Sequence, residues 1–84
     1  MYWQVNWSTE AENNLAEIWL EADNRDEVTE ASDTMNRTLQ HTPEKHLKSL
    51  SEGLYFLDIT PLRAYVEVDF TQKVISVAAI GRPY

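Results

Sequence analysis

The sequence predicts an α+β fold in which a hairpin of two helices packs on one face of a small antiparallel sheet. Two observations support this prediction. Apolar residues recur at helical spacing over much of the first half of the chain, and they alternate with polar residues over most of the second half. Helices followed by a run of strands are typical of α+β domains. A chain of 84 residues forms one domain, so we expect a single domain over 1–84 with the order β-α-α-β-β-β.

The N-terminal half is expected to contain one strand and two helices. Residues 2–7 alternate aromatic or apolar side chains with polar ones, which predicts a short strand. Ser8 and Thr9 supply a helix N-cap, and a helix is expected over 9–22. A second helix is expected over 26–40, and Pro43 prevents its continuation. The expected apolar stripes are Ala11, Leu15, Ile18, Trp19 and Ala22 on the first helix, and Val28, Ala31, Met35 and Leu39 on the second.

The C-terminal half is expected to contain three strands, over 54–59, 62–70 and 74–80. In the middle strand, five apolar residues that end at Phe70 alternate with Arg63, Tyr65, Glu67 and Asp69. Because strand side chains alternate between faces, one face should be buried and the other should face water. The last strand is expected to place Ile75, Val77 and Ala79 on one face. Segment 43–52 is less regular, and we expect a loop with one helical turn and with Leu47 and Leu50 beneath it.

Charge is distributed unevenly along the chain. Residues 1–34 hold nine carboxylates against one base, Arg25, whereas residues 35–84 hold five carboxylates against six bases. The net charge of −7 argues against general adhesion to nucleic acid, because phosphate binding requires clustered cations. It leaves open a local site on the nearly neutral half. On the acidic half, the simplest interpretation is a solvated helix surface.

Composition limits the chemistry that is available. The chain has no cysteine, which excludes disulfides, thiolate nucleophiles and thiolate metal sites. His41 and His46 lack the companions that a metal site requires, so we expect neither a metal nor another cofactor. The N-terminus has no signal-peptide pattern, and the apolar runs are too short to span a bilayer. We therefore expect a cytoplasmic protein that does not enter a membrane.

The element order and the C-terminal residues resemble the RelE/ParE superfamily of bacterial type II toxin–antitoxin toxins, over nearly the whole chain. A strand followed by Trp7-Ser8 and a helix looks like the opening of that family. The segment PLRAYVEVD at 61–69 looks like its third strand. The segment VISVAAIGRPY at 74–84 looks like its last strand and its basic–aromatic tail. The resemblance implies a helical hairpin on a sheet and an antitoxin partner.

Resemblance to the ribosome-dependent mRNA endonuclease branch implies four catalytic candidates. Arg63 matches the strand arginine that stabilises charge on the scissile phosphate. Arg82 and Tyr84 match the arginine and the tyrosine of the tail. Glu44 precedes a Leu-Lys and a Gly much as the general base does in a similar member, with a one-residue difference in spacing. Pro83 replaces a histidine of that member.

A general acid would therefore have to come from another residue, such as His46 or Tyr84. Lys45, Lys48 and Tyr65 are candidate substrate contacts on the same half of the chain. The alternative for Arg63 is an ordinary exposed strand arginine paired with Glu67.

Three functions remain open. The first is an mRNA endonuclease toxin that acts on the ribosome, although its relatives are usually basic and this chain has a pI of about 4.6. The second is a non-catalytic ParE-like binder of a protein such as DNA gyrase. The acidic charge and Pro83 argue less strongly against this function than against an endonuclease. The third is a repurposed interaction module. Whether the chain is an enzyme is thus left open. Exposed edge strands would also allow a homodimer.

Overall fold

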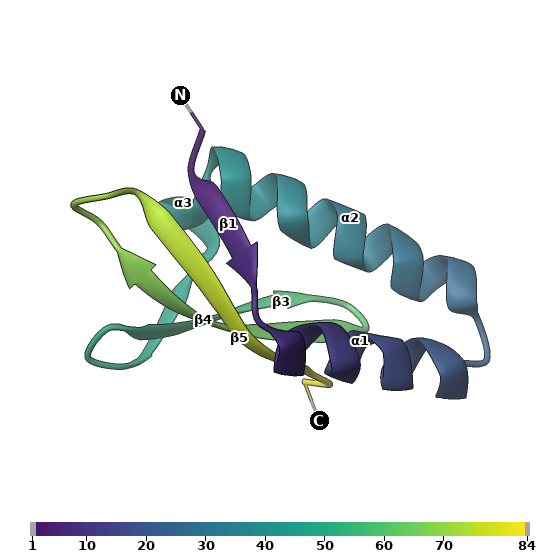
Figure 1. The fold of residues 1–84 in the computed structure, drawn as a ribbon. Coiled ribbons are helices and arrows are strands. Elements are labelled where there is room, and N and C mark those ends of the chain that lie inside the picture. The colour runs from purple at the N-terminus through teal and green to yellow at the C-terminus, as the bar shows by residue number, and fades with distance from the viewer. Residues whose placement is uncertain (1, 84) are drawn as a thin grey trace.

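The computed structural model describes residues 2–83 and confirms the predicted α+β class. Two long helices pack on one face of a five-stranded sheet and leave the other face open (Figure 1). The elements are β1 (Gln4–Trp7), α1 (Thr9–Glu21), α2 (Arg25–His41), α3 (Pro43–His46), β2 (Lys48–Ser51), β3 (Leu54–Ile59), β4 (Leu62–Asp69) and β5 (Val74–Gly81). None of the helices within the described range is long and apolar enough to cross a membrane.

The sheet differs from the prediction in two ways. Its strand order is β1-β5-β4-β3-β2, and β1 pairs with β5 in parallel, so the sheet is mixed rather than antiparallel. β1 is an edge strand beside the inner strand β5, and the three helices and strands β2–β4 lie between the two in the chain. In segment 43–52 the expected helical turn is present as α3, but the expected loop after it contains the edge strand β2. Leu47 packs against the core as expected, but Leu50 is 47% exposed.

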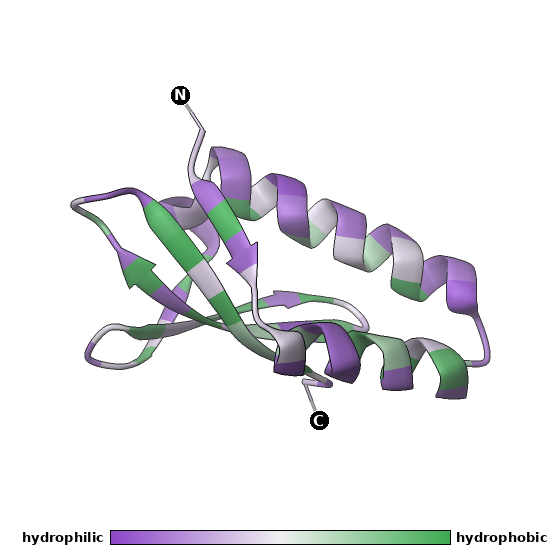
Figure 2. Ribbon diagram, viewed as in Figure 1, coloured by the Kyte–Doolittle hydropathy of each residue, from purple (hydrophilic) through white to green (hydrophobic). Residues whose placement is uncertain are grey.

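The core lies between the helices and the sheet. Figure 2 shows hydrophobic residues alternating with hydrophilic ones along the strands, and hydrophilic residues along most of α2. The predicted stripe of α2 is confirmed, because all four of its residues are buried. On α1 only Ala11 is fully buried, and Trp19 at 38% exposure lies at the edge of the stripe rather than within it. Phe70 was also placed wrongly, because β4 ends at Asp69 and Phe70 is 54% exposed in the following turn.

A β-bulge in β5 changes which residues face the core. The β4–β5 register shifts so that Tyr65 pairs with Ala79 but Val66 pairs with Val77, leaving Ala78 as the extra residue. Ile80 is therefore buried instead of Ala79, contrary to the predicted alternation. The backbone around the bulge finds partners near α1. The Ser8 hydroxyl donates to the Ala78 carbonyl, and the Ile80 N–H donates to Oδ1 of Asn14.

Candidate functional site

The open face of the sheet carries Arg63 in a fixed orientation. Arg63 lies on β4 between the fully buried Leu62 and Ala64, so its side chain projects away from the helices. Directly opposite on β3 is Asp58. The guanidinium donates from Nε to Oδ1 at 2.6 Å and from Nη2 to Oδ2 at 3.0 Å. This two-bond geometry holds the guanidinium plane in one position. The partner is Asp58, not Glu67, which was the partner in the alternative interpretation of Arg63.

The ion pair shifts the titration of both groups. The hydrogen bond from Arg63 is the main cause that lowers the pKa of Asp58 below its ordinary value, and burial opposes it. The same hydrogen bond raises the pKa of Arg63 further above its ordinary value. The side chains remain 24% and 33% exposed. Because exposed ion pairs contribute little to stability, the main effect of the pair is to orient Arg63.

Aromatic rings surround this ion pair. Phe56 and Tyr65 are cross-strand partners, and Cζ of Arg63 lies 4.4 Å from the centroid of the Phe56 ring. Nζ of Lys48, on the edge strand β2, lies 6.0 Å from the same centroid. A hydrogen bond with Tyr65 also contributes to the raised pKa of Arg63. We call Lys48, Phe56, Asp58, Arg63 and Tyr65 the open-face cluster.

The Tyr65 ring lies beside Gly81 on the neighbouring strand. A Cβ built at Gly81 would be in ordinary van der Waals contact with Cε2 of Tyr65, at 3.5 Å. Gly81 is also the β5 partner of Arg63. The end of β5 therefore forms the third strand under the cluster without adding a charged side chain.

The other predicted site residues lie away from this cluster. Glu44 and Lys45 are exposed on the short helix α3. Among residues 2–83, no hydrogen bond or ion pair joins either of them to Arg63. His46, considered as an alternative acid, ends the same helix. Tyr84 lies outside the described residues.

Arg82 faces the helices instead of the open face. It lines two hollows with residues of α1 or the turn after it, including Ile18 and Glu21. Its surroundings are acidic, because Glu17, Asp23 and Glu27 line the same hollows. The structure thus brings together Arg63, Lys48 and Tyr65, and separates Arg82 from them.

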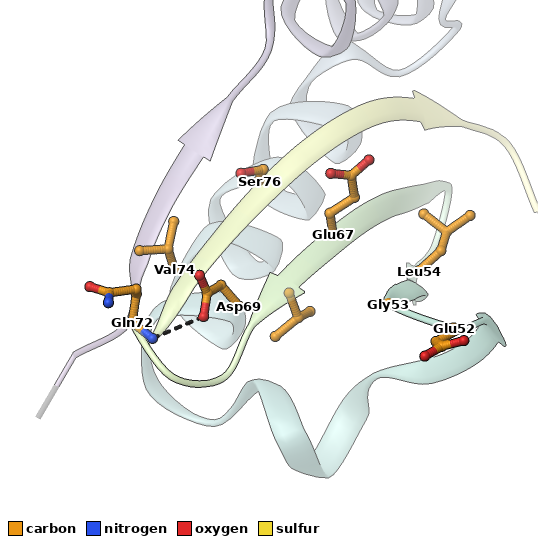
Figure 3. A pocket seen from close by; sticks show the side chains of 9 residues that line it. Glu52, Gly53, Leu54, Glu67, Asp69, Gln72, Val74 and Ser76 are labelled. Carbon is orange, nitrogen blue, oxygen red and sulfur yellow. Dashed lines mark hydrogen bonds between the residues drawn. The ribbon is translucent and has the colours of Figure 1, made fainter.

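The far end of the open face is acidic. A hollow of about 580 Å³ lies there between β4, β5 and the β2–β3 turn, and Figure 3 shows Glu52, Glu67 and Asp69 around it. Oδ1 of Asp69 accepts hydrogen bonds from the backbone N–H groups of Thr71 and Gln72, which fixes the β4–β5 turn. Within the part of the chain that the structure describes, no group of three or more His, Cys, Asp or Glu residues is arranged to hold a metal ion.

The open-face cluster suits recognition of an anion or a planar group. Arg63 has five N–H donors; Asp58 accepts two of them and Tyr65 a third, so two remain for a ligand. The Phe56 and Tyr65 rings beside them offer stacking surfaces. Asp58 and Tyr65 are the members of the cluster that could carry out proton transfer, and both interact with Arg63. The geometry therefore fits binding more directly than acid–base chemistry.

Sequence reasoning missed Phe56 and Asp58, although a signal was available. Only Thr60 and Pro61 separate β3 from β4. So short a connection pairs Ile59 with Leu62, which places Asp58 opposite Arg63. The residues of a predicted hairpin therefore have to be read in cross-strand pairs as well as along each strand.

Two helices over a mixed sheet in this strand order form a RelE/ParE-like fold, which confirms the predicted resemblance at the level of the fold. No protein-family model and no curated protein sequence matches the chain.

Three solved structures are similar over nearly their whole length. The toxin–antitoxin complex RelBE2 from Mycobacterium tuberculosis matches with a TM-score of 0.80 at 13% identity, over 98% of this chain and 99% of that chain. The chromosomal ParDE toxin–antitoxin system from P. aeruginosa gives 0.67 at 20% identity, over 95% of each chain. The intact RelBE toxin–antitoxin complex from E. coli gives 0.63 at 13% identity, over 98% of each chain. Identities this low establish a shared fold.

Proposed function

We propose that this chain is the toxin of a type II toxin–antitoxin pair, acts in the cytoplasm and is held inactive by an antitoxin. The observation that supports the proposal is the fold, because whole-length similarity joins the chain to proteins solved in toxin–antitoxin systems. Because one fold can serve several functions, the target has to be argued from the site.

The open-face cluster is the proposed working surface, and mRNA on the ribosome is the first candidate target. Arg63 would contact the scissile phosphate through its remaining N–H donors, since a guanidinium stays charged and grips phosphate at two points. Lys48 would add a second positive charge, and Phe56 and Tyr65 would stack on bases. Four of the five residues of the cluster thus have a role in RNA binding.

Cleavage would additionally require proton transfer. A base must act on the 2′-hydroxyl and an acid must protonate the leaving 5′-oxygen, and each contributes typically 10²–10⁴-fold. Glu44 is the proposed base and Tyr84 or His46 the proposed acid. Glu44 and His46 lie on α3, outside the open-face cluster, so α3 would have to close over the bound RNA. Arg82 would turn from the helix side to the substrate in the same step.

A second candidate is a non-catalytic toxin that binds a protein target such as DNA gyrase. The Arg63–Asp58 ion pair favours it, because the carboxylate already neutralises the arginine that an RNA phosphate would need. The separation of Glu44 and Arg82 from Arg63 points the same way. In this interpretation the open-face cluster is a recognition surface, and its aromatic and arginine residues are the types enriched at the centres of interfaces.

Induction in a bacterial host separates these functions. Translation is followed by incorporation of labelled amino acid, and DNA supercoiling is followed on a plasmid. Arg63→Ala is compared with Arg37→Ala, a matched control on the exposed side of α2. Arrest of translation that Arg63→Ala relieves and Arg37→Ala does not would support the RNA target.

Altered supercoiling with normal translation would support the protein target. Arrest of translation by Arg63→Ala as strong as by the wild type would refute the role of Arg63. No effect on either process would refute the toxin proposal and favour a repurposed interaction module. A short neighbouring reading frame with a DNA-binding start and a disordered tail is the expected source of the antitoxin.

A further inference from the structure

The strand β2 forms one edge of the sheet and is open along its length. The strand order leaves one side of β2 without a neighbouring strand among residues 2–83. All four residues of β2 are exposed, and Leu50 is 47% exposed. Leu50 also has no partner of its own on β3, because the register shifts between Ser49 and Ser51. An open strand edge presents N–H and C=O groups that can pair with another strand.

The sequence of this edge is complementary to itself. Residues 48–52 read KSLSE, with a base at one end, an acid at the other and an apolar residue in the centre. In two antiparallel copies with Leu50 opposite Leu50, each Lys48 lies opposite the partner's Glu52, and each Ser49 lies opposite the partner's Ser51. Any other antiparallel register loses both Lys–Glu pairs. Because opposite charges directly across two strands stabilise their pairing, the edge favours a second copy in this single register.

The two charged residues of the edge have no ion-pair partner within one copy. Among residues 2–83, neither Lys48 nor Glu52 takes part in an ion pair. Nζ of Lys48 lies 6.0 Å from the centroid of the Phe56 ring. Glu52 lines the acidic hollow beside two other carboxylates, Glu67 and Asp69. A second copy would supply an opposite charge to both ends of the edge.

The net charge of −7 does not prevent this contact, because it is concentrated elsewhere. Segment 43–53 holds two carboxylates and two lysines, so the surroundings of the edge are balanced in charge. In Figure 1 the β2–β3 turn lies at the left of the molecule, whereas α1, with its carboxylates, lies at the right. Exposed charges more than about 8 Å apart are largely screened at physiological salt. The charges of the edge itself therefore decide whether two copies attract each other.

We propose that two copies of this chain associate through antiparallel pairing of their β2 strands, with Leu50 on the two-fold axis. The dimer has one continuous sheet of ten strands, five from each copy. Because the axis is perpendicular to the sheet, both open-face clusters lie on the same side. The partner's Glu52 pairs with Lys48, so each copy contributes a residue to the cluster of the other. The proposal depends on the edge and is independent of the toxin function.

The size of the contact sets the expected affinity. Four residues at a rise of about 3.4 Å form an edge about 14 Å long. Such a contact buries less than the roughly 1,200 Å² of a stable interface, so the dissociation constant should be about 10–500 µM. Sedimentation equilibrium of the whole chain between about 5 µM and 1 mM should show the mean mass rise from 9.8 kDa toward twice that value.

Charge reversal at the two ends of the edge tests the register. Lys48→Glu and Glu52→Lys each place like charges opposite each other twice, and each should weaken self-association by about tenfold or more. An equimolar mixture of the two variants should associate again, because each pair across the strands is then Lys with Glu. Arg37→Glu is the matched control, since it changes the net charge as Lys48→Glu does but lies on the exposed side of α2. Circular dichroism checks that each variant is folded.

A cross-link tests the position of the two-fold axis. The chain has no cysteine, so Leu50→Cys introduces a single thiol. Opposite Cα atoms of antiparallel strands are about 4.5–5.5 Å apart, a separation that a disulfide can span. Oxidised glutathione should link this variant into a covalent dimer about tenfold faster or more than it links Phe70→Cys, in which the thiol lies in the exposed β4–β5 turn.

A wild-type chain that stays at 9.8 kDa up to about 1 mM would overturn the proposal, and would leave the edge to a strand of another protein. Self-association that both charge reversals leave unchanged, or that their mixture does not restore, would place the contact elsewhere and overturn it as well. Equal cross-linking rates for Leu50→Cys and Phe70→Cys would refute the position of the axis.

Discussion

Replacing Leu62 with alanine tests the packing that positions Arg63. Leu62 is 0% exposed at the start of β4, directly before Arg63. A buried Leu→Ala change costs about 2–5 kcal/mol through lost burial and the cavity that remains. A domain of this size has about 4–13 kcal/mol of stability. A loss of about 3 kcal/mol would therefore remove a large share of it and lower Tm by about 12–24 °C.

Urea unfolding followed by far-ultraviolet circular dichroism measures this loss. Leu20→Ala is the matched control, because Leu20 is 62% exposed and its removal should cost less than about 0.5 kcal/mol. The dependence of unfolding free energy on urea should be unchanged in both variants. Equal destabilisation by the two changes would refute the assignment of Leu62 to the core, and with it the orientation of Arg63 toward the open face.

Three further predictions concern single side-chain contacts. Asp58→Asn should raise the affinity for a single-stranded RNA oligonucleotide at low salt by about threefold to fivefold in an anisotropy titration, because it removes the carboxylate that neutralises Arg63; a lower affinity would contradict this. Because the folded-state pKa of Asp58 is lowered, the ion pair stabilises the fold above the ordinary pKa of 3.8 and this contribution is lost as pH falls through the lowered pKa. The urea midpoints of wild type and Asp58→Asn should therefore converge below that pH, and a constant difference down to pH 2 would contradict the pKa shift. Asn36→Ala removes the acceptor for Nε1 of Trp7 at 3.2 Å and should cost about 0.5–1.5 kcal/mol by urea unfolding, whereas the exposed Asn13→Ala should not.

The sequence was sufficient for the elements whose residues follow a regular period. The α2 stripe matches its predicted place because periodicity and burial agree there, and β3 has its predicted bounds. Trp19 and Phe70 were assigned to the core wrongly, because an aromatic ring at the end of an apolar stripe can lie at its edge. There Trp19 meets Arg25, and Phe70 meets the rings of Trp3 and Tyr55. Such contacts depend on neighbours that are distant in the chain or lie beyond the element.

Three members of the open-face cluster were predicted from the residues of single segments, and the other two follow from the pairing of segments. Arg63 and Tyr65 stand out on β4, and Lys48 stands out as a base in an acidic chain. Asp58 gains its importance only from its position opposite Arg63. Phe56 gains its importance in the same way, as the cross-strand neighbour of Lys48 and Tyr65.

The place of Arg82 depends on one extra residue in β5. With strict alternation, Ile75, Val77 and Ala79 would face the core, and Arg82 would project from the same face as Arg63. The bulge at Ala78 buries Ile80 instead, and a one-residue shift moves every later side chain to the other face. Arg82 therefore lies among the carboxylates near the end of α1.

This separation gives the molecule two unlike surfaces. Arg63 lies on the open face beside aromatic rings and close to Lys48. Arg82 lies on the helical side, among carboxylates. A ligand with phosphate groups would be attracted to the first surface and repelled by the second. A basic partner segment would prefer the second. Because the helices and the open face lie on opposite sides of the sheet (Figure 1), a ligand bound at one surface leaves the other uncovered.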